Sequence, residues 1–321
     1  MLLYHGLAAL APSFQPFYYP IGLIGQIFAL LVAACWSQNS IVYAFAGKRV
    51  GSSTVTHLRL WIALPVIVLV HLAFTGDLIP LGLSWGAYFN LSISGLAGFF
   101  IADLLIFKAF VDIGHRETLV IMTTSPIFSA AGSWFILGEV LSVIQVAGIV
   151  LTVAGVCWVL FSESRVQSTP RSAGRRRIIT GAVFALLGTI VQAAGLLIAK
   201  YGMGSDINPI SANLLRVAAG LAGLVIFAAF RGELITDFKK MRDTRALLLI
   251  SSGSVLGPVL GMILTLYAFT MAEVGVVTTL MQTSPIMLLP IDKFFFKRHV
   301  PIGAVLGTFL AVGGAALLFI G

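Results

Sequence analysis

The chain alternates long apolar stretches with short polar ones, and the apolar stretches have the length of membrane-spanning helices. Each is close to the ~20 residues that an α-helix needs to cross the hydrocarbon core of a bilayer. The pattern predicts ten spans with no soluble domain between them. Their approximate limits are 21–46, 53–74, 84–110, 117–137 and 141–161 in the first half, and 178–200, 208–230, 246–270, 274–295 and 300–320 in the second.

The sequence also repeats itself, which divides the ten spans into two sets of five. Thr-Ser-Pro-Ile at 124–127 recurs 159 residues later at 283–286, and Ala-Phe at 109–110 recurs at 268–269. A membrane bundle that is doubled with an odd number of helices per copy is typical of inverted-repeat transporters. The repeat therefore predicts an all-α integral membrane protein, with ten transmembrane helices arranged as two inverted five-helix repeats.

One short hydrophilic segment separates the two copies. It contains serine, proline, glycine and five arginines, whereas the N-terminal residues are apolar but interrupted by prolines. From this organisation we expect an N-terminal interfacial segment at 1–20, a first repeat at 21–161, a basic linker loop at 162–177 and a second repeat at 178–321.

Charged residues are scarce, and most lie outside the spans. Hydrophobic residues make up 59% of the chain and charged residues 10%, against about 25% charged in soluble domains. The net charge of +8 does not indicate nucleic acid, because the basic residues sit in short loops and form no contiguous stripe. The loops after odd-numbered spans, with their helix ends, hold 17 of the 20 lysines and arginines. By the positive-inside rule these loops are cytoplasmic and both termini face outward, in a multi-pass protein of the cell's inner (plasma) membrane.

Four ionisable residues within or beside the spans are candidates for function, because a charge in hydrocarbon costs at least about 2.5 kcal/mol. Asp103, inside the third span, could bind a cation, a substrate amine or a proton, or pair with Arg59 or Lys108 to hold helices together. Arg59 and Arg216 occupy matching positions in the second and seventh spans, where each could attract an anionic group or tie helices. Glu117 begins the fourth span, where the helix dipole suits a carboxylate and a structural cap explains it.

The repeated Thr-Ser-Pro element is the second source of candidates. Pro126 and Pro285 each remove the N–H that would bond a carbonyl four residues earlier. Neighbouring hydroxyls can satisfy that carbonyl or face a polar cavity. Broken helices at symmetric positions point to a midplane binding site, although a kink that only shapes the bundle is the alternative. Uncharged polar groups also lie midway along the first and sixth spans. We therefore expect the solute to contact Gln38, Asn39, Asp103, Thr124, Gln192 and Thr283, and we assign Arg59, Arg216, Pro126, Pro285 and Glu117 to structure or gating.

These features resemble the drug/metabolite transporter superfamily, in particular the EamA-type exporters with ten helices in two repeats. The resemblance covers about residues 25 to 320. It rests on Ser-Pro-Ile at 125–127 and 284–286, Leu-Gly-Glu at 137–139, Arg59, and a set of spaced residues in the fifth and tenth spans: Gln145, Gly148, Gly307 and Gly314. It implies export of small metabolites or amino acids through a central cavity by alternating access.

The chain differs from the pattern of this family in three ways. Arg298 stands where the second copy would match Glu139. The first span has no acidic residue, so the membrane glutamate that couples protons in the related small multidrug-resistance proteins has no counterpart. The outward termini differ from the inward termini usual for ten-helix relatives. Of the acids in the spans, Asp103 is then the first candidate for proton coupling.

The sequence leads to the hypothesis of a secondary transporter, and specifically an exporter, of a small metabolite such as an amino acid or an amphipathic organic solute. The first, third, fourth, sixth, eighth and ninth spans would line its path. A lipid-linked carrier or flippase of the same superfamily is the alternative, which would need a lateral opening and a basic headgroup pocket. An enzyme is not expected, because the sequence has no HExxH, GxSxG or paired catalytic carboxylates. We expect no cofactor and no metal. The expected partners are a small-molecule solute and the lipid bilayer, with no nucleic acid, and both a monomer and a homodimer remain open.

Overall fold

Helices form every regular element in the described part of the chain. The computed structural model describes residues 18–113, 115–164, 175–294 and 301–320, and within them it contains α- and π-helices and no strand. In a bilayer only a helix or a closed barrel satisfies all backbone N–H and C=O groups, which is why long apolar runs fold this way. The predicted N-terminal interfacial segment and basic linker, and Arg298, fall largely or wholly outside the described residues.

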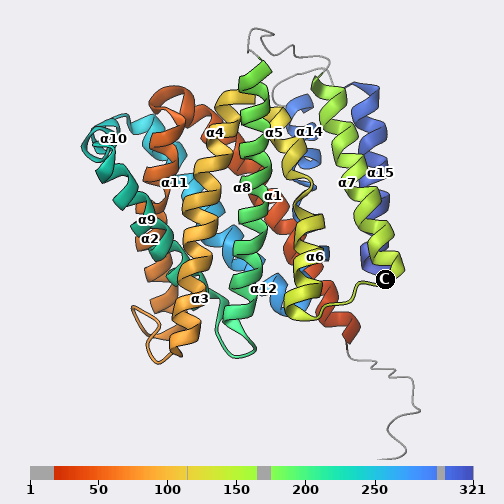
Figure 1. The fold of residues 1–321 in the computed structure, drawn as a ribbon, viewed down its shortest axis with the longest axis horizontal. Helices are drawn as coiled ribbons and strands as arrows, with labels where there is room; N and C mark the ends of the chain where they lie inside the picture. Colours follow the sequence, from red (N-terminus) through yellow and green to blue (C-terminus); the bar gives the residue numbers. More distant parts are fainter. Residues whose placement is uncertain (1–17, 114, 165–174, 295–300, 321) are drawn as a thin grey trace, which may run out of the picture.

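The first half consists of five consecutive spans (Figure 1). Two of them are composite, because the third contains a π-helical segment and the fourth is broken. In chain order the elements are α1 (Tyr18–Val50), α2 (Ser52–Thr75), α3 (Trp85–Gly95) with η1 (Leu96–Ala102) and α4 (Asp103–Ile113), α5 (His115–Met122) with α6 (Ser125–Leu137), and α7 (Val143–Ser164).

The second half repeats this order, with the addition of a short helix, α10 (Leu234–Lys240). Its spans are α8 (Arg175–Met203), α9 (Pro209–Phe230), α11 (Thr244–Ser254) with η2 (Val255–Gly261) and α12 (Met262–Met271), α13 (Val274–Met281) with α14 (Ser284–Phe294), and α15 (Ile302–Ile320). Within the described residues, nine segments are long and apolar enough to cross a membrane. The tenth span, α13 with α14, is broken and runs to the edge of a described range.

The two halves pack as inverted repeats that exchange their first helices. α1 packs against α11, η2, α12, α13 and α14 of the second half, and α8 packs against α3, η1, α4, α5 and α6 of the first. α2 packs against α9, and α7 against α15. Each contact therefore recurs when the halves are interchanged. α1 starts at the lower end of the bundle and α8 at the upper end (Figure 1), which confirms the predicted fold class of two inverted five-helix repeats.

Glycines allow α7 and α15 to approach each other closely. A Cβ built on Gly155 would lie 2.4 Å from the backbone nitrogen of Ala311, and one on Gly314 would lie 2.5 Å from that of Thr152. A Cβ on Gly148 or Gly307 would lie 2.8 Å from the nearest atom of the opposite helix. In lipid the hydrophobic effect does not drive helices together, so they associate through close packing, which small residues at the interface allow. These four glycines lie seven residues apart within each helix, so each pair lies on one helix face.

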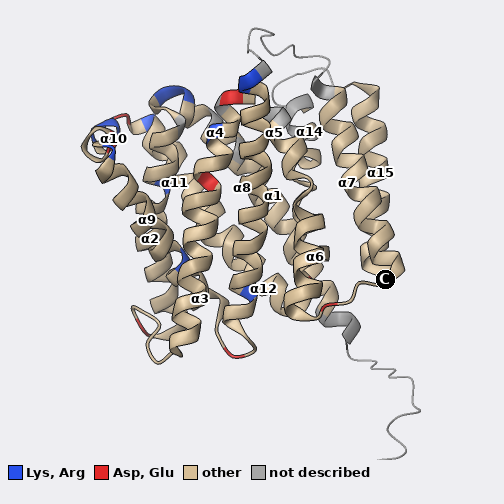
Figure 2. Cartoon of the chain, in the orientation of Figure 1, with Lys and Arg blue, Asp and Glu red and all other residues tan. Residues whose placement is uncertain are grey.

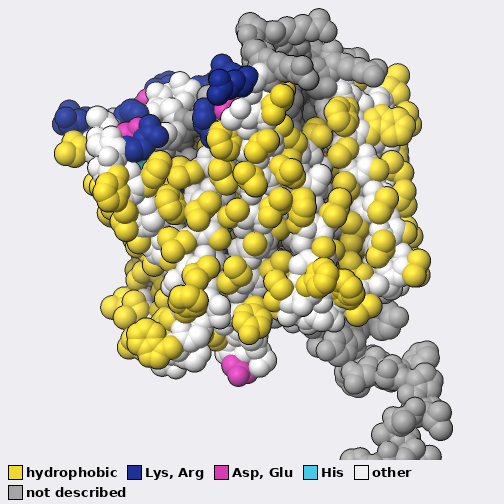
Figure 3. All heavy atoms as spheres, viewed as in Figure 1, with side chains coloured by type: hydrophobic (Ala, Val, Ile, Leu, Met, Phe, Trp, Pro, Cys, Tyr) yellow, Lys and Arg dark blue, Asp and Glu magenta, His cyan; other side chains and the backbone are white. Residues whose placement is uncertain are grey.

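The outer surface matches a membrane environment. Lysines and arginines gather at the upper end of the bundle, and hydrophobic side chains cover the middle of the visible face (Figures 2 and 3). Large apolar side chains such as Phe135 and Phe309 are 78% and 73% exposed. The 22 residues of α9 extend about 33 Å at 1.5 Å per residue, which matches a hydrocarbon core of about 30 Å. The protein is a multi-pass membrane protein.

Candidate functional site

One span in each half is broken at the same place. Residues 123–124 separate α5 from α6, and residues 282–283 separate α13 from α14. Pro126 and Pro285 follow as the second residues of α6 and α14. At that position a proline costs no helical hydrogen bond, since the first turn has no intrahelical acceptor for its N–H. The Thr-Ser-Pro elements thus start new helices, and the expected kinks are two-residue breaks.

Side chains add hydrogen bonds to backbone carbonyls at these breaks. The hydroxyls of Thr124 and Thr283 each donate to the carbonyl three residues earlier, at 2.6 and 2.7 Å. The carbonyl of Met122 loses its usual donor at Pro126, and it accepts a bond from Gln282 Nε2 at 3.0 Å. Because Gln282 belongs to the other half, this bond joins the two breaks. The hydroxyl protons of Thr124 and Thr283 are engaged by backbone, and their oxygens can still accept.

Arg59 and Asp103 form a buried ion pair between α2 and α4. The two residues are 4% and 8% exposed. The Arg59 guanidinium also lies 5.9 Å from the ring centre of Tyr43 and 5.8 Å from that of Phe107. Lys108, the other partner considered for Asp103, bonds instead to the carboxylate four residues further on, at 3.0 Å. The pair has the geometry of a tie between helices.

Arg216 occupies the matching position in α9 but has different surroundings. It is 1% exposed. Its guanidinium lies 5.4 Å from the ring centre of Phe99, and Nη1 lies 3.0 Å from the sulfur of Met262. Within the described ranges no carboxylate forms an ion pair with it, and its Nε has no hydrogen-bond partner. Of the two matching arginines, Arg59 therefore has a carboxylate as its counter-ion, and Arg216 has none among the described residues.

The amides predicted to meet the solute lie in three different environments. Asn39 is 1% exposed and packs against the junction of α11 and η2, where its amide donates to the carbonyl of Gly253 in α11 at 2.8 Å and accepts from the N–H of Gly257 in η2 at 3.2 Å. Gln38, next in the chain, is exposed, and Gln192 in α8 is half-buried. Asn39 thus serves the backbone where α11 meets η2. Glu117 is the third residue of α5, and its side chain is outside the described part of the structure.

No hydrogen bond joins any two of the six predicted solute contacts in the described structure. Asp103 is held by Arg59, Asn39 by the backbone of α11 and η2, and the two threonines by their own helix ends. They lie on α1, α4, α8 and the breaks of the fourth and ninth spans. The structure thus distributes these residues over the central helices.

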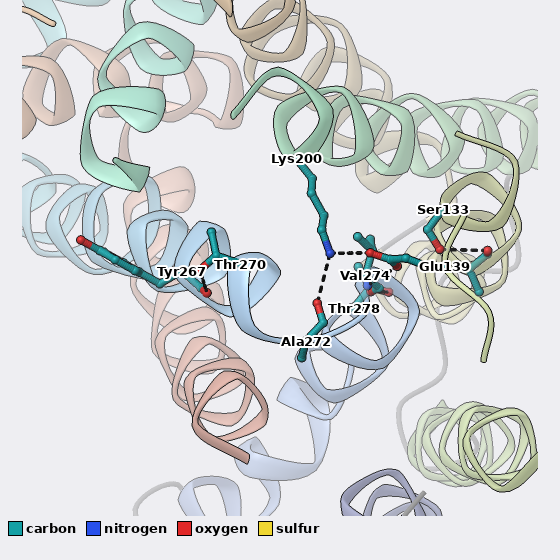
Figure 4. A network of polar contacts seen from close by, with 9 residues as sticks. Ser133, Glu139, Lys200, Tyr267, Thr270, Ala272, Val274 and Thr278 are labelled. Carbon is teal, nitrogen blue, oxygen red and sulfur yellow. Dashed lines mark hydrogen bonds and ion pairs between the residues drawn. The ribbon is translucent and has the colours of Figure 1, made fainter. Parts of the chain in front are cut away.

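A polar cluster that the sequence did not predict joins the two halves (Figure 4). It lies where α6 and α8 end, opposite to the end at which the basic residues gather (Figures 1 and 2). Gly138 ends α6 in a left-handed turn at φ 69°, and the next residue is Glu139. One Glu139 oxygen pairs with Lys200 of α8, and the other accepts from the N–H of Val274 at 2.9 Å, at the start of α13. Lys200 also donates to the carbonyl of Ala272 at 3.3 Å. We call this cluster the Glu139 clamp.

The π-helical segments were also not predicted, although the repeat offset contains a signal for them. Val255, the first residue of η2, lies 159 residues after Leu96, the first residue of η1. Each segment contains a glycine at the same offset, Gly98 and Gly257. π-helical turns are rare and are frequent at functional sites. Their symmetric placement in the third and eighth spans marks the region beside Asp103 and Met262.

The arrangement offers polar contacts within a helical bundle. Within the described ranges, no group of three or more His, Cys, Asp or Glu side chains could hold a metal ion.

Comparison with known proteins gives consistent similarities over nearly the whole chain. The sequence model of the EamA-like transporter family matches residues 23–161 and 179–320. A protein of Archaeoglobus fulgidus, named an uncharacterized transporter, is 24% identical over 297 residues, which cover 92% of this chain and 97% of that protein. A solved crystal structure of a protein has a TM-score of 0.67 at 18% sequence identity, and the match covers 94% of this chain and 97% of that chain.

Proposed function

Because the chain belongs to the EamA-like transporter family, we propose that it is a secondary transporter that exports a small organic metabolite by alternating access. The observation that supports this most is the pair of inverted five-helix repeats, each with a break in its fourth span at the same place. Transporters built from inverted repeats bind solute near the repeat interface, at discontinuous helices.

The moving parts in this proposal are the two repeats, at 21–161 and 178–321. They are in contact through α1 and α8, which each pack into the opposite half, and through the close pair α7 and α15. The breaks at 123–124 and 282–283 give the fourth and ninth spans points at which backbone angles can change. Rocking of one bundle against the other would then open the path at one end while closing it at the other.

Polar links at both ends are the gates of the proposed cycle. The Glu139 clamp ties the halves at one end. At the basic end, Arg49 of α1 pairs with Asp243, the N-cap of α11, at 2.9 Å. The positive-inside rule assigns the basic end to the cytoplasm, with both termini outside, in the plasma membrane. The Glu139 clamp is then the outer gate.

The solute path would be lined by the residues predicted from the sequence, with Asp103 as the candidate for proton coupling. Asp103 would exchange its bond to Arg59 for a proton during the cycle. If it does so, Asp103→Asn removes the pH dependence of transport. Transport with an unchanged pH profile in that variant would exclude Asp103 from coupling.

Counterflow in proteoliposomes tests the proposed function. Purified protein is reconstituted, loaded in turn with unlabelled amino acids, nucleosides, sugars and organic cations, and assayed for uptake of the labelled solute. The proposal expects one class to exchange faster than in protein-free liposomes, without ATP. Absence of exchange for every class, in vesicles whose protein is shown to be folded by thermal unfolding, would contradict it.

A further inference from the structure

The inverted repeats place a different partner beside each of the two buried arginines. In the first half, Arg59 pairs with Asp103, the residue that follows η1. In the second half, Arg216 meets Met262, the residue that follows η2 and lies 159 residues after Asp103. The guanidinium, the helix and the position are retained, and only the carboxylate is missing. Arg216 is thus a buried cation whose internal counter-ion is replaced by a thioether.

A second polar atom without a partner lies one turn away on the same helix. Asn213 is 0% exposed, and its Nδ2 donates to the carbonyl of Pro258 in η2 at 2.8 Å. This bond fixes the orientation of the amide, and its Oδ1 has no hydrogen-bond partner in the described structure. Arg216 and Asn213 both contact the eighth span, at residues 262 and 258. Each of the two residues uses one polar atom in that contact and leaves another unpaired, Nε in Arg216 and Oδ1 in Asn213.

Neither atom is satisfied by water at the surface, because both residues are buried. A buried charge without a counter-ion is strongly destabilising, and an unpaired buried acceptor adds to that loss. The first half shows that the fold can supply a carboxylate at this position. Retention of both unpaired groups in the second half therefore indicates that something outside the chain completes them.

The surroundings restrict what can complete them. The third span approaches Arg216 through glycines, and a Cβ on Gly98 would lie 3.4 Å from Nη2. The ring of Phe99 covers the guanidinium at 5.4 Å. One cation beside one neutral amide balances a single negative charge, so a dianion such as a phosphate ester would keep an uncompensated charge in hydrocarbon.

Resting on the proposed transport function, we propose that Arg216 and Asn213 bind a small monocarboxylate that carries a hydrogen-bond donor on the neighbouring carbon. The carboxylate bonds to the guanidinium of Arg216 and supplies the negative charge that Asp103 supplies beside Arg59. The adjacent hydroxyl group donates to Oδ1 of Asn213. The transported solutes are then 2-hydroxy acids, bound between η1 and η2.

Met262→Asp tests the proposal by restoring the missing carboxylate. The full-length protein in detergent is titrated at pH 7 with glycolate, lactate and mandelate, and with lactamide and propanoate as matched probes, while thermal unfolding is followed. In the native protein at least one hydroxy acid raises Tm. Lactamide, which lacks the negative charge, is expected to bind with an apparent affinity about ten- to hundredfold lower than that of lactate. Propanoate, which lacks the hydroxyl, is also expected to bind more weakly than lactate.

Met262→Asn is the control, since it has nearly the shape of aspartate and no charge. Met262→Asp is expected to unfold at a higher temperature than Met262→Asn and to lose the response to hydroxy acids, whereas Met262→Asn keeps it. A hydroxy-acid response that survives in Met262→Asp, an equal response to lactate and lactamide, or no response to any acid would overturn the proposal.

The two proposals fail in different ways. Acid binding without counterflow would contradict transport and leave the site standing. Counterflow of a cation or a neutral sugar that is unaffected by Met262→Asp would contradict the site and leave transport standing.

Discussion

Replacing Asp103 by asparagine leaves the guanidinium of Arg59 buried without its carboxylate. Both residues are nearly inaccessible, at 4% and 8% exposure, so the substitution belongs with broken buried pairs, which cost about 3–5 kcal/mol. Exposed pairs, in contrast, contribute about 0–1 kcal/mol. The rings of Tyr43 and Phe107, at 5.9 and 5.8 Å, offset part of the loss because a cation gains about 0.5–2 kcal/mol over a ring. We therefore expect a loss of about 3 kcal/mol, at the lower end of the range.

Thermal unfolding of the protein in detergent, followed by tryptophan fluorescence, measures this loss. At about 2 °C per kcal/mol for a chain of this size, Tm falls by about 6 °C in Asp103→Asn. Two variants serve as controls. Lys108→Met, whose side chain is 54% exposed in its ion pair, changes Tm by less than about 2 °C. The double variant Arg59→Met with Asp103→Met removes both charges and is expected to be more stable than the single variant. A Tm for Asp103→Asn within about 1 °C of the native value, or a double variant that unfolds before the single one, would refute the reasoning.

Three further predictions concern the helix interface, the outer gate and the basic end. Gly155→Ala is expected to lower stability by about 1–3 kcal/mol, because its Cβ would lie 2.4 Å from the backbone of α15, whereas Gly313→Ala, with nothing within 4 Å, should be neutral or stabilising in thermal unfolding. Lys200→Met removes an ion pair from the Glu139 clamp and should raise the population open at that end by about tenfold, which labelling of an introduced cysteine would detect; equal labelling rates would exclude the clamp as a gate. The N–H of Ala246, followed by Arg49, lowers the pKa of Asp243, so its contribution to stability is present above the unfolded value of about 3.9 and is lost as pH falls through the lower folded value. The difference in Tm between native protein and Asp243→Asn should therefore disappear in acid, and a difference that is constant with pH would contradict this assignment.

Much of the fold follows from the sequence because lipid imposes simple constraints. Apolar runs of sufficient length must be helices, and a repeat with five helices must invert. The spaced glycines of α7 and α15 were informative for the same reason, since a close helix contact requires the absence of a side chain on both sides. Pro126 and Pro285 located the breaks to within two residues.

The details of the site depended on contacts between residues far apart in the chain. Asn39 is a polar residue midway along a span. The sequence alone does not show that the Asn39 amide bonds to the backbone where α11 meets η2. In the sequence Glu139 is only the last residue of Leu-Gly-Glu at 137–139, because its partners Lys200 and Val274 lie 61 and 135 residues away. The contrast between Asp103 and Met262 is present in the sequence at the repeat offset, yet it gains meaning only when Arg59 and Arg216 are seen to reach those positions.

Distances between spin labels on the two repeats, measured at both ends of the reconstituted protein, test alternating access most directly. One pair, at Val140 and Ser205, reports on the end with the Glu139 clamp, and a second pair, at Lys48 and Arg242, reports on the basic end; all four side chains are exposed. The labels are placed in a chain whose two native cysteines are replaced by alanine. We predict two populations for each pair, such that conditions or variants that lengthen one distance shorten the other. A single unchanging distance at each end, or two ends that lengthen together, would contradict the account.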